Sequence, residues 1–257
     1  MIGLIGGSGF EDPKLFKIEE EKTIVTEFGK PSGKIKIGKI AGKKIAFISR
    51  HGTKHTINPT NVNYRANIQA LKDLGVKKIL ASSAVGSLKE EFRPGELAFV
   101  DQFIDRTTKR QQTFFDKEQV AHVSVAEPFC VNLRKHLIDS AEKLKIPYHE
   151  KGTVVVIEGP RFSTKAESLL FRSWNAEIIG MTLVPEAILA REAEICYASI
   201  ALITDYDVWK EKPVDVETVL KVMKENSRKL QQLIEKVIPL IEEKDCECNT
   251  ALKHALI

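Results

Sequence analysis

The sequence lacks a long hydrophobic run. No segment approaches the roughly 18 consecutive apolar residues of a membrane helix, so an integral membrane protein of the helical type is excluded. The first residues carry no basic stretch before an apolar segment, which disfavours a secretory signal peptide and predicts a cytoplasmic protein. A strong charge bias is also absent. The formal net charge is +4, from 39 basic and 35 acidic residues without a basic block, so neither nucleic acid nor a membrane surface is expected as a partner.

Cysteine is scarce, with four residues among 257. Cys130 and Cys196 lie in apolar segments, which favours buried, reduced thiols. Cys246 and Cys248 form a Cys-Glu-Cys sequence, and a zinc site there would need two more ligands, which are not nearby in sequence, so no metal is expected. A disulfide within this pair, or between it and the other two cysteines, is the alternative. The many Lys and Glu residues and only three Met favour a thermophilic origin, where such cytosolic disulfides are commonest.

Short apolar runs alternate with amphipathic segments along the chain. We expect strands at residues 2–5, 44–49, 78–82, 97–103, 153–157, 177–180 and 198–204. We expect helices at residues 61–74, 131–144, 165–174, 186–194 and 215–242. This alternation predicts one three-layer α/β/α domain over residues 1–257, ending in a long helix and the Cys-Glu-Cys tail. The doubled strands of the first half favour a mixed central sheet.

Polar groups suited to an anion follow several of these strands. In the Gly-Gly-Ser-Gly loop around Ser8, backbone amides and a hydroxyl can approach phosphate, although a tight turn would give the same pattern. Arg50 offers a planar fork of donors and His51 can donate a further hydrogen bond, with a packed imidazole as the alternative. Ser83 and the amide that follows it offer another hydroxyl and donor. Because ligands of open α/β sheets bind beyond the carboxyl ends of strands, these groups predict one composite site.

Asp205 and Asp207 follow the last apolar strand. Paired acids can hold a metal, act as acid and base, or bind the edge of a purine, and a solvated acidic loop is the alternative. Burial would raise the pKa of a carboxyl and favour a protonated form that donates to purine N7. Neither a Walker motif nor a G-x-S-x-G sequence is present, which disfavours a P-loop nucleotidase and a serine hydrolase.

Six motifs together carry a family likeness, at residues 6–10, 50–52, 103–107, 126–130, 158–163 and 204–209. Their types, order and spacing resemble the methylthioadenosine phosphorylase branch of the trimeric purine nucleoside phosphorylases, from residue 2 to about residue 228. The resemblance implies a nucleoside phosphorylase-like α/β fold. It also implies a homotrimer or a dimer of trimers, and neither a metal nor an organic cofactor, because inorganic phosphate is the co-substrate.

The resemblance also assigns residues to each part of the site. Phosphate would be bound by Ser8, Arg50, His51, Ser83, Ala84 and Thr182. The nucleoside would contact Phe162, Ser163, Met181, Asp205 and Asp207, the two acids being the catalytic residues. An apolar pocket for the 5′-methylthio group would be formed by Val216, Val219 and Leu220, although the buried face of a helix would look alike. His122 would be contributed across a subunit interface.

The reaction expected from this resemblance is phosphorolysis of 5′-deoxy-5′-methylthioadenosine to adenine and 5-methylthioribose 1-phosphate. The main alternative is a purine nucleoside phosphorylase with broad or 6-oxopurine preference, acting on inosine, guanosine or methylthioinosine. A nucleotide-binding protein without catalysis, and a nucleoside hydrolase that uses water, are the remaining alternatives. The first would not need Arg50, His51 and Asp205 together, and the second would not need phosphate.

Overall fold

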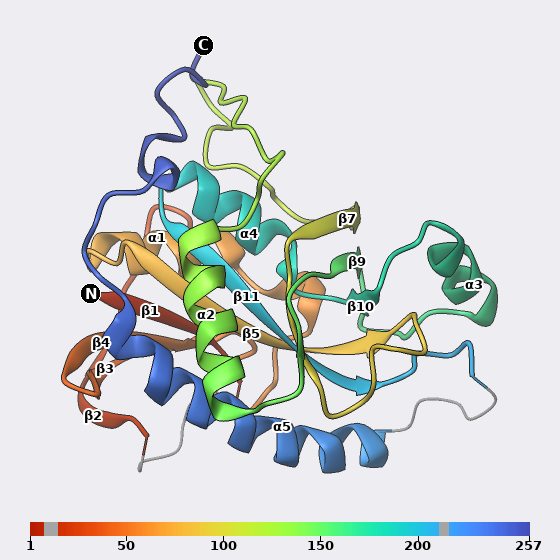
Figure 1. Ribbon diagram of the computed structural model, residues 1–257. Helices are drawn as coiled ribbons and strands as arrows, with labels where there is room; N and C mark the ends of the chain where they lie inside the picture. The colour runs from red at the N-terminus through yellow and green to blue at the C-terminus, as the bar shows by residue number, and fades with distance from the viewer. Residues whose placement is uncertain (8–14, 211–215) are drawn as a thin grey trace.

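The computed structural model describes residues 1–7, 15–210 and 216–257 (Figure 1). Its centre is a sheet of eleven strands. They are β1 Ile2–Gly6, β2 Lys17–Lys22, β3 Ile35–Ile40, β4 Lys43–Ser49, β5 Lys78–Ser87, β6 Leu97–Phe99, β7 Gln102–Arg106, β8 Tyr148–His149, β9 Thr153–Ile157, β10 Ile178–Gly180 and β11 Cys196–Asp205.

The sheet is mixed, as the doubled strands of the first half predicted. Its main path runs β2-β3-β4-β1-β5-β10-β9-β7, and β11 pairs with both β5 and β6. Strand β1 is parallel to β4 and β5, and β11 is parallel to β5. The pairs β3–β4, β5–β10 and β6–β11 are antiparallel. The two ten-residue strands, β5 and β11, lie side by side at the centre, so the residues at their carboxyl ends are held together.

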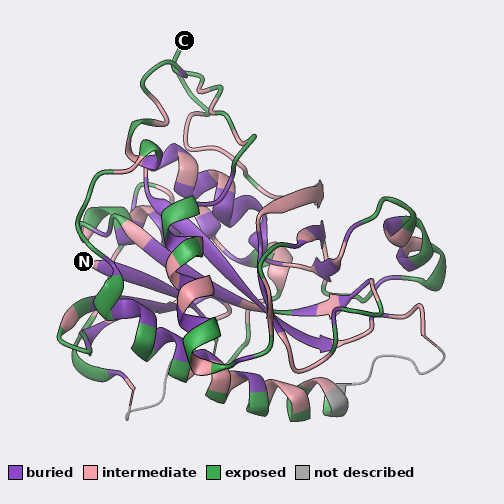
Figure 2. Ribbon diagram, viewed as in Figure 1, coloured by how far each residue is buried: buried purple, intermediate pink, exposed green. Residues whose placement is uncertain are grey.

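Helices cover both faces of the sheet, which confirms the three-layer α/β/α architecture. Helices α1 (Tyr64–Asp73) and α4 (Leu183–Glu192) pack together on one face, and α2 (Val131–Leu144) and α5 (Val216–Val237) pack together on the other. Helix α3 (Lys165–Ser173) lies apart, at the end of the sheet away from the N-terminus (Figure 1). The buried residues form a continuous band along the central strands (Figure 2). Among the described residues, no helix is both long and apolar enough to cross a membrane.

Local sequence signals explain the helix ends. Helix α1 ends at Leu74, and Gly75 follows with φ +78°, which is the left-handed C-terminal position that glycine adopts without strain. Helix α3 begins with a capping box in which Thr164 and Glu167 bond each other's backbone. Helix α5 ends at Val237 and a short 3₁₀ turn follows, because Pro239 cannot continue an α-helix.

Several predicted strand boundaries were wrong. The strand expected at residues 97–103 is two strands, β6 and β7, which pair with different neighbours, and β5 continues five residues further than expected. Strands β2 and β8 were missed because β2 is exposed and charged and β8 has only two residues. Strand β3 was missed although its alternating Ile35, Ile37 and Ile40 are buried. Helix α4 begins three residues earlier than expected.

The packing of α5 against the sheet predicts the effect of a substitution in that helix. Leu233 is fully buried against the sheet. Leu233→Ala should lower the free energy of unfolding by about 2–5 kcal/mol, because it removes buried methyl groups and leaves a cavity. Gln232→Ala changes an exposed neighbour on the same helix and should stay within roughly 0.5 kcal/mol of the parent. Denaturant titration of both variants checks this, and equal effects would contradict the packing of this face.

Candidate active site

One cavity gathers residues that lie far apart in the sequence. It has a volume of about 410 Å³ and lies at the carboxyl ends of β5, β10 and β11. Of the predicted site residues, it is lined by Arg50, His51, Ser83, Ala84, Phe162, Ser163, Met181, Thr182, Asp205, Asp207, Val219 and Leu220. Ser8 lies outside the described residues, although the preceding Gly7 lines the cavity, and the side chain of Val216 is likewise outside them.

Arg50 is held rigidly at one end of the cavity. Its Nε and Nη2 donate to the two carboxylate oxygens of Glu186 at 2.7 Å each, and its Nη1 donates to the Ser82 carbonyl at 2.8 Å. Glu186 is fully buried in α4 and also accepts from the Tyr197 hydroxyl at 2.8 Å. Burial disfavours the charged guanidinium, but the adjacent Glu186 carboxylate outweighs this effect and the pKa of Arg50 is raised. Among the described contacts, one N–H on each terminal nitrogen is left for an anion.

His51 differs from its predicted role as a donor. Burial and the adjacent charge of Arg50 lower the pKa of His51 to about 4, so the ring is neutral at pH 7. Its Nδ1 lies 2.8 Å from the Ile57 carbonyl, which can only accept, so the ring proton is on Nδ1. The remaining Nε2 carries a lone pair. His51 therefore offers an acceptor, and it suits a phosphate oxygen that still carries its proton.

The other phosphate candidates come from β5 and α4. Ser83 and Ala84 lie inside β5, not after a strand end as the sequence predicted, because that strand continues to Ser87. Thr182 stands at the N-terminus of α4, yet its hydroxyl forms no capping hydrogen bond and lines the cavity. These groups and Arg50 bring hydroxyls and a cation to the same cavity, as an anion site requires.

Asp205 and Asp207 lie at the other end of the cavity. The Oδ1 of Asp205 accepts from the Asp207 amide at 2.8 Å, and its Oδ2 accepts from the Thr204 hydroxyl at 2.7 Å. Burial raises the pKa of both carboxyls. Asp207 is almost fully buried, and among the described residues its Oδ2 has no hydrogen-bond partner. Its backbone is left-handed, with φ +49°, a conformation that Asp and Asn adopt more readily than most residues.

Further polar groups surround Asp207. The hydroxyl of Ser163 is buried and lacks a described partner. The hydroxyl of Ser168 is buried beside Asp207 and partly opposes the rise in the pKa of that carboxyl. Gly86 leaves room for the acids, since a Cβ there would lie 2.9 Å from Asp205 Oδ1. Buried polar groups without partners are rare in folded proteins, so this end of the cavity is suited to a ligand with several donors and acceptors.

Apolar groups form the remaining wall. Phe162 is 44% exposed and Leu220 is 64% exposed, and both line the cavity from different segments. Val219 and Met223 extend this wall along α5. Met181, directly before Thr182 in the chain, also lines the cavity. Its sulfur packs against Gly159, where a Cβ would leave too little room for it.

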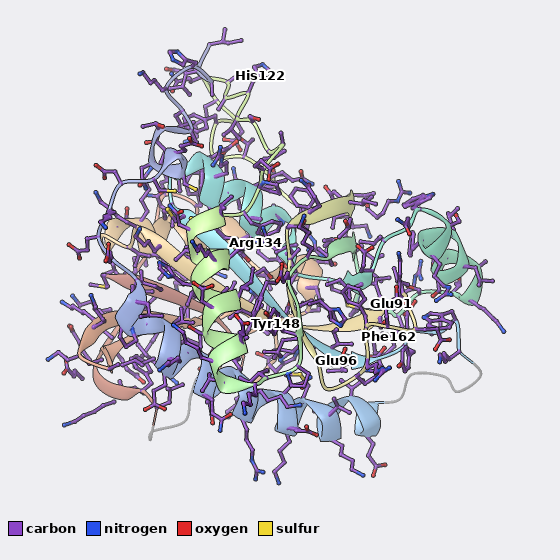
Figure 3. The ribbon with its side chains drawn as sticks, in the orientation of Figure 1. Glu91, Glu96, His122, Arg134, Tyr148 and Phe162 are labelled. Atoms are coloured by element: carbon purple, nitrogen blue, oxygen red, sulfur yellow. The ribbon has the colours of Figure 1, made fainter. Side chains whose placement is uncertain are left out.

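His122 does not reach this cavity within its own chain. It lies on a loop that pairs with the C-terminal segment, its amide donating to the Ala255 carbonyl at 2.7 Å. Figure 3 shows it at the protruding end of the molecule, far from Phe162. The placement leaves its expected role across a subunit interface as a prediction.

The sequence interpretation did not assign several lining or supporting residues to the site, and three of them matter most. Glu186 holds Arg50, Gly86 makes room for Asp205, and Met223 extends the apolar wall. A glutamate within an apolar helix was the one signal that could have revealed Glu186. A second cavity, of about 250 Å³, lies near Met1, Lys44 and Lys244 and contains none of the predicted residues.

Comparisons with known proteins show the family of this chain. Residues 1–239 match the description of the phosphorylase superfamily. The chain belongs to that superfamily. It is 56% identical over 257 residues to the S-methyl-5′-thioadenosine phosphorylase of Thermofilum pendens, covering all of this chain and 98% of that one. It is 54% identical to the enzyme of the same name from Xenopus tropicalis, covering 95% of this chain and 90% of that one.

Solved structures show the same fold. A methylthioadenosine phosphorylase from an antarctic soil metagenomic library superposes with a TM-score of 0.95 at 43% identity, covering 100% of this chain and 92% of that one. The methylthioadenosine phosphorylase from Schistosoma mansoni in complex with adenine gives a TM-score of 0.93 at 39% identity, covering 98% and 96% of the two chains. These matches confirm the expected nucleoside phosphorylase-like α/β fold.

The raised pKa of the Asp207 carboxyl predicts a gain of stability on substitution. A carboxyl whose pKa is raised by folding stabilises the protein below its unfolded pKa, and this contribution is lost as the pH rises through the folded pKa. Asp207→Asn mimics the protonated form and tolerates the left-handed backbone. The variant should therefore unfold at a higher temperature than the parent at pH 8, by roughly 1 kcal/mol of free energy, with the difference shrinking towards acid.

Thermal unfolding between pH 4 and pH 8 measures this difference. The control is Asp73→Asn, which changes an exposed carboxylate on α1 outside the cavity. A variant at Asp207 that is less stable than the parent at pH 8 would show that the carboxylate is satisfied in the folded protein.

Proposed function

We propose that this protein is an enzyme that catalyses phosphorolysis of 5′-deoxy-5′-methylthioadenosine, giving adenine and 5-methylthioribose 1-phosphate. The observation that supports this most strongly is the lining of a single cavity. It has a cation and hydroxyls at one end, a buried carboxyl with one unpaired oxygen at the other, and apolar side chains beside them. The names of relatives at 51–56% identity support the same substrate. In this proposal the phosphate and purine occupy the two ends, and the ribose lies between them.

Arg50 and His51 fix the phosphate by different means. The two remaining N–H groups of Arg50 bind a pair of unprotonated phosphate oxygens, because a guanidinium edge matches two oxygens at once. The Nε2 lone pair of His51 accepts from the protonated oxygen. This arrangement selects the HPO₄²⁻ ion, and it turns an unprotonated oxygen towards the sugar. Ser83, Ala84 and Thr182 complete the wall, and we assign Ser8 the same role.

The purine lies against Phe162 and reaches the two acids. Asp205, in its protonated form, donates towards N7, and Asp207 accepts from the exocyclic amino group. Ser163 supplies a hydroxyl beside them. The apolar Val219, Leu220 and Met223 receive the 5′-methylthio group, and we assign Val216 to the same wall. A 5′-hydroxyl would lose its hydrogen bonds to water there without replacement.

The reaction is a substitution at C1′ in which the phosphate replaces the purine. The C1′–N9 bond lengthens first, so positive charge develops on the ribose, and the phosphate dianion stabilises it from the opposite face. A phosphate oxygen then bonds to C1′ with inversion, while the bonding pair leaves with the purine, and N7 takes the proton from Asp205. Because Arg50 and the strands hold both reactants in place, orientation supplies part of the rate acceleration.

The competing substrates differ at the purine and at the 5′ position. Inosine and guanosine carry a 6-oxo group, which accepts, and an ionised Asp207 would repel it. Adenosine carries a 5′-hydroxyl, which has no described polar partner among the side chains of α5 that line the cavity. Both differences favour methylthioadenosine.

A rate comparison tests the proposal. We expect kcat/KM to be highest for methylthioadenosine, lower for adenosine and methylthioinosine, and lowest for inosine, in every case only when phosphate is present. Faster turnover of inosine would overturn the substrate assignment, and undiminished cleavage in phosphate-free buffer would indicate a hydrolase. Asp207→Asn should lower kcat/KM for methylthioadenosine by about 10-fold or more, corresponding to roughly 1.4 kcal/mol for one lost charge-assisted hydrogen bond.

We also propose that His122 completes the site of a neighbouring subunit in a trimer or a dimer of trimers. A complementation experiment tests this. His122→Ala and Asp205→Ala subunits are each expected to have low activity, but co-expressed subunits should form mixed oligomers with greater activity than either variant, because a wild-type His122 then meets an intact Asp205. Activity no higher than the average of the two variants would contradict the exchange.

A further inference from the structure

Arg110 is a buried cation that the reaction described above does not use. It belongs to the long connection between β7 and α2, and its side chain is only 1% exposed. It does not line the cavity of the active site. Its hydrogen bonds nevertheless go to the two chain segments that carry the opposite sides of that cavity, which are residues 157–163 after β9 and residues 182–186 at the start of α4.

On the base side, Arg110 holds the beginning of the segment that carries Phe162 and Ser163. Its Nε donates to the Glu158 Oε1 at 3.0 Å, and its Nη2 donates to the Glu158 carbonyl at 2.7 Å. The other carboxylate oxygen of Glu158 accepts from the Thr108 amide at 2.6 Å. Both the side chain and the backbone of Glu158 are therefore fixed, four residues before the aromatic ring that faces the cavity.

On the phosphate side, the same guanidinium holds the start of α4. Its Nη1 donates to the Val184 carbonyl at 2.5 Å. Val184 departs from helical geometry, with φ −103° and ψ 131°, which turns its carbonyl towards Arg110 and not along the helix. Val184 stands between Thr182, whose hydroxyl lines the cavity, and Glu186, the carboxylate that holds the cationic end of the cavity. One hydrogen bond therefore fixes the middle of the phosphate-side segment.

Every N–H group of Arg110 has an acceptor in the protein. Besides the bonds above, Nη1 donates to the Tyr64 hydroxyl at 3.2 Å and Nη2 makes a longer contact with the Ile157 carbonyl at 3.5 Å. A guanidinium has five N–H groups in one fixed plane, so these bonds account for all of them. No donor is left for a substrate, and the plane sets where the two segments lie relative to each other.

The sheet does not provide this connection. Strands β9 and β10 are parallel neighbours, but their described pairing ends where Gly180 lies opposite Val156. The chain on both sides leaves the ladder after that pair and then forms the cavity wall. There the Met181 sulfur packs against Gly159, which is an apolar contact without directional hydrogen bonds. Arg110 supplies the directional link between the two segments beyond the end of the sheet.

We propose that Arg110 is a positioning residue for the phosphorolysis, because it sets the spacing between the base-side segment 157–163 and the phosphate-side segment 182–186. This inference rests on the proposed function and adds a residue that touches neither substrate. The phosphate oxygen must meet C1′ while the purine stays against Phe162. A small error in the spacing of the two segments therefore slows the reaction, even when every group that contacts a substrate is still present.

Steady-state kinetics of full-length Arg110→Lys and Glu158→Gln test the proposal, with thermal unfolding used to confirm that each variant is folded at the assay temperature. Lysine keeps the charge but donates from a single atom, so it cannot hold both segments. In Arg110→Lys, kcat should fall about 10-fold or more while both KM values stay within about 3-fold of the parent, because alignment is lost and the binding groups remain. Glu158→Gln weakens one of these bonds and should lower kcat in the same way but less. Unchanged kcat in either folded variant would overturn the proposal.

Hydrogen exchange gives a second measurement that does not depend on the substrate. In Arg110→Lys, exchange should become faster at residues 157–163 and 182–186 together. Unchanged exchange at both segments would contradict the proposal.

Arg65→Gln is the matched control. Arg65 lies on α1 and binds the same connection, through the Thr113 carbonyl at 3.4 Å and the Asp116 carboxylate at 2.5 Å, but it has no described bond to either segment. This variant should keep the parent kcat. An equal loss in Arg65→Gln and Arg110→Lys would assign the effect to a general loosening of the connection and contradict the proposal.

The assay uses whichever nucleoside the parent cleaves fastest, so the two proposals fail separately. A parent that prefers inosine overturns the substrate assignment alone. A parent that prefers methylthioadenosine, with Arg110→Lys equally fast, overturns the role of Arg110 alone.

Discussion

The buried ion pair between Arg50 and Glu186 is the constraint on which the site depends. A guanidinium removed from water is unfavourable unless its donors and charge are matched, and Glu186 matches both from a different layer of the fold. The pair joins the end of β4 to α4, and Tyr197 links it to β11. The cation that faces the cavity is therefore rigid before any ligand arrives, so an anion can bind without first ordering a flexible side chain.

The two ends of the cavity carry opposite electrostatic problems. At one end a positive charge is fully compensated by protein, with two N–H groups left over. At the other end burial raises the pKa of Asp207, and its Oδ2 has no described hydrogen-bond partner, so a ligand that supplies a donor there would stabilise the folded protein. A group left without a hydrogen bond can persist where function requires it. It favours a base that donates to the carboxyl over an apolar ligand that cannot.

Much of the fold followed from the sequence, and the reasons for the failures are specific. Periodicity located α2 at its observed bounds, and strand ends located most of the cavity wall, because both depend on local pattern. The division into β6 and β7, and the extension of β5, depend on which strand pairs with which, and that is a tertiary property.

Partnerships between distant residues were likewise beyond the sequence. Glu186 was not recognised because nothing local marks it as the partner of Arg50. The role of His51 was reversed because its tautomer is set by the Ile57 carbonyl, which the turn after β4 brings to the ring. The convergence of Cys130 and Cys196 with the tail is of the same kind, since the first two lie 66 positions apart in the sequence.

The parallel pairing of β5 and β11 has a consequence for how this site can change over evolutionary time. Ser83 lies opposite Ala201, and Gly86 lies opposite Asp205 after a register shift, so both ends of the cavity are spaced along one ladder. Each residue adds about 3.3 Å and reverses the facing of the next side chain. Point substitutions can alter which base is accepted, whereas inserting or deleting a single residue in either strand would misplace one end relative to the other. Descendants of this protein are thus free to vary in composition at the site but not in length.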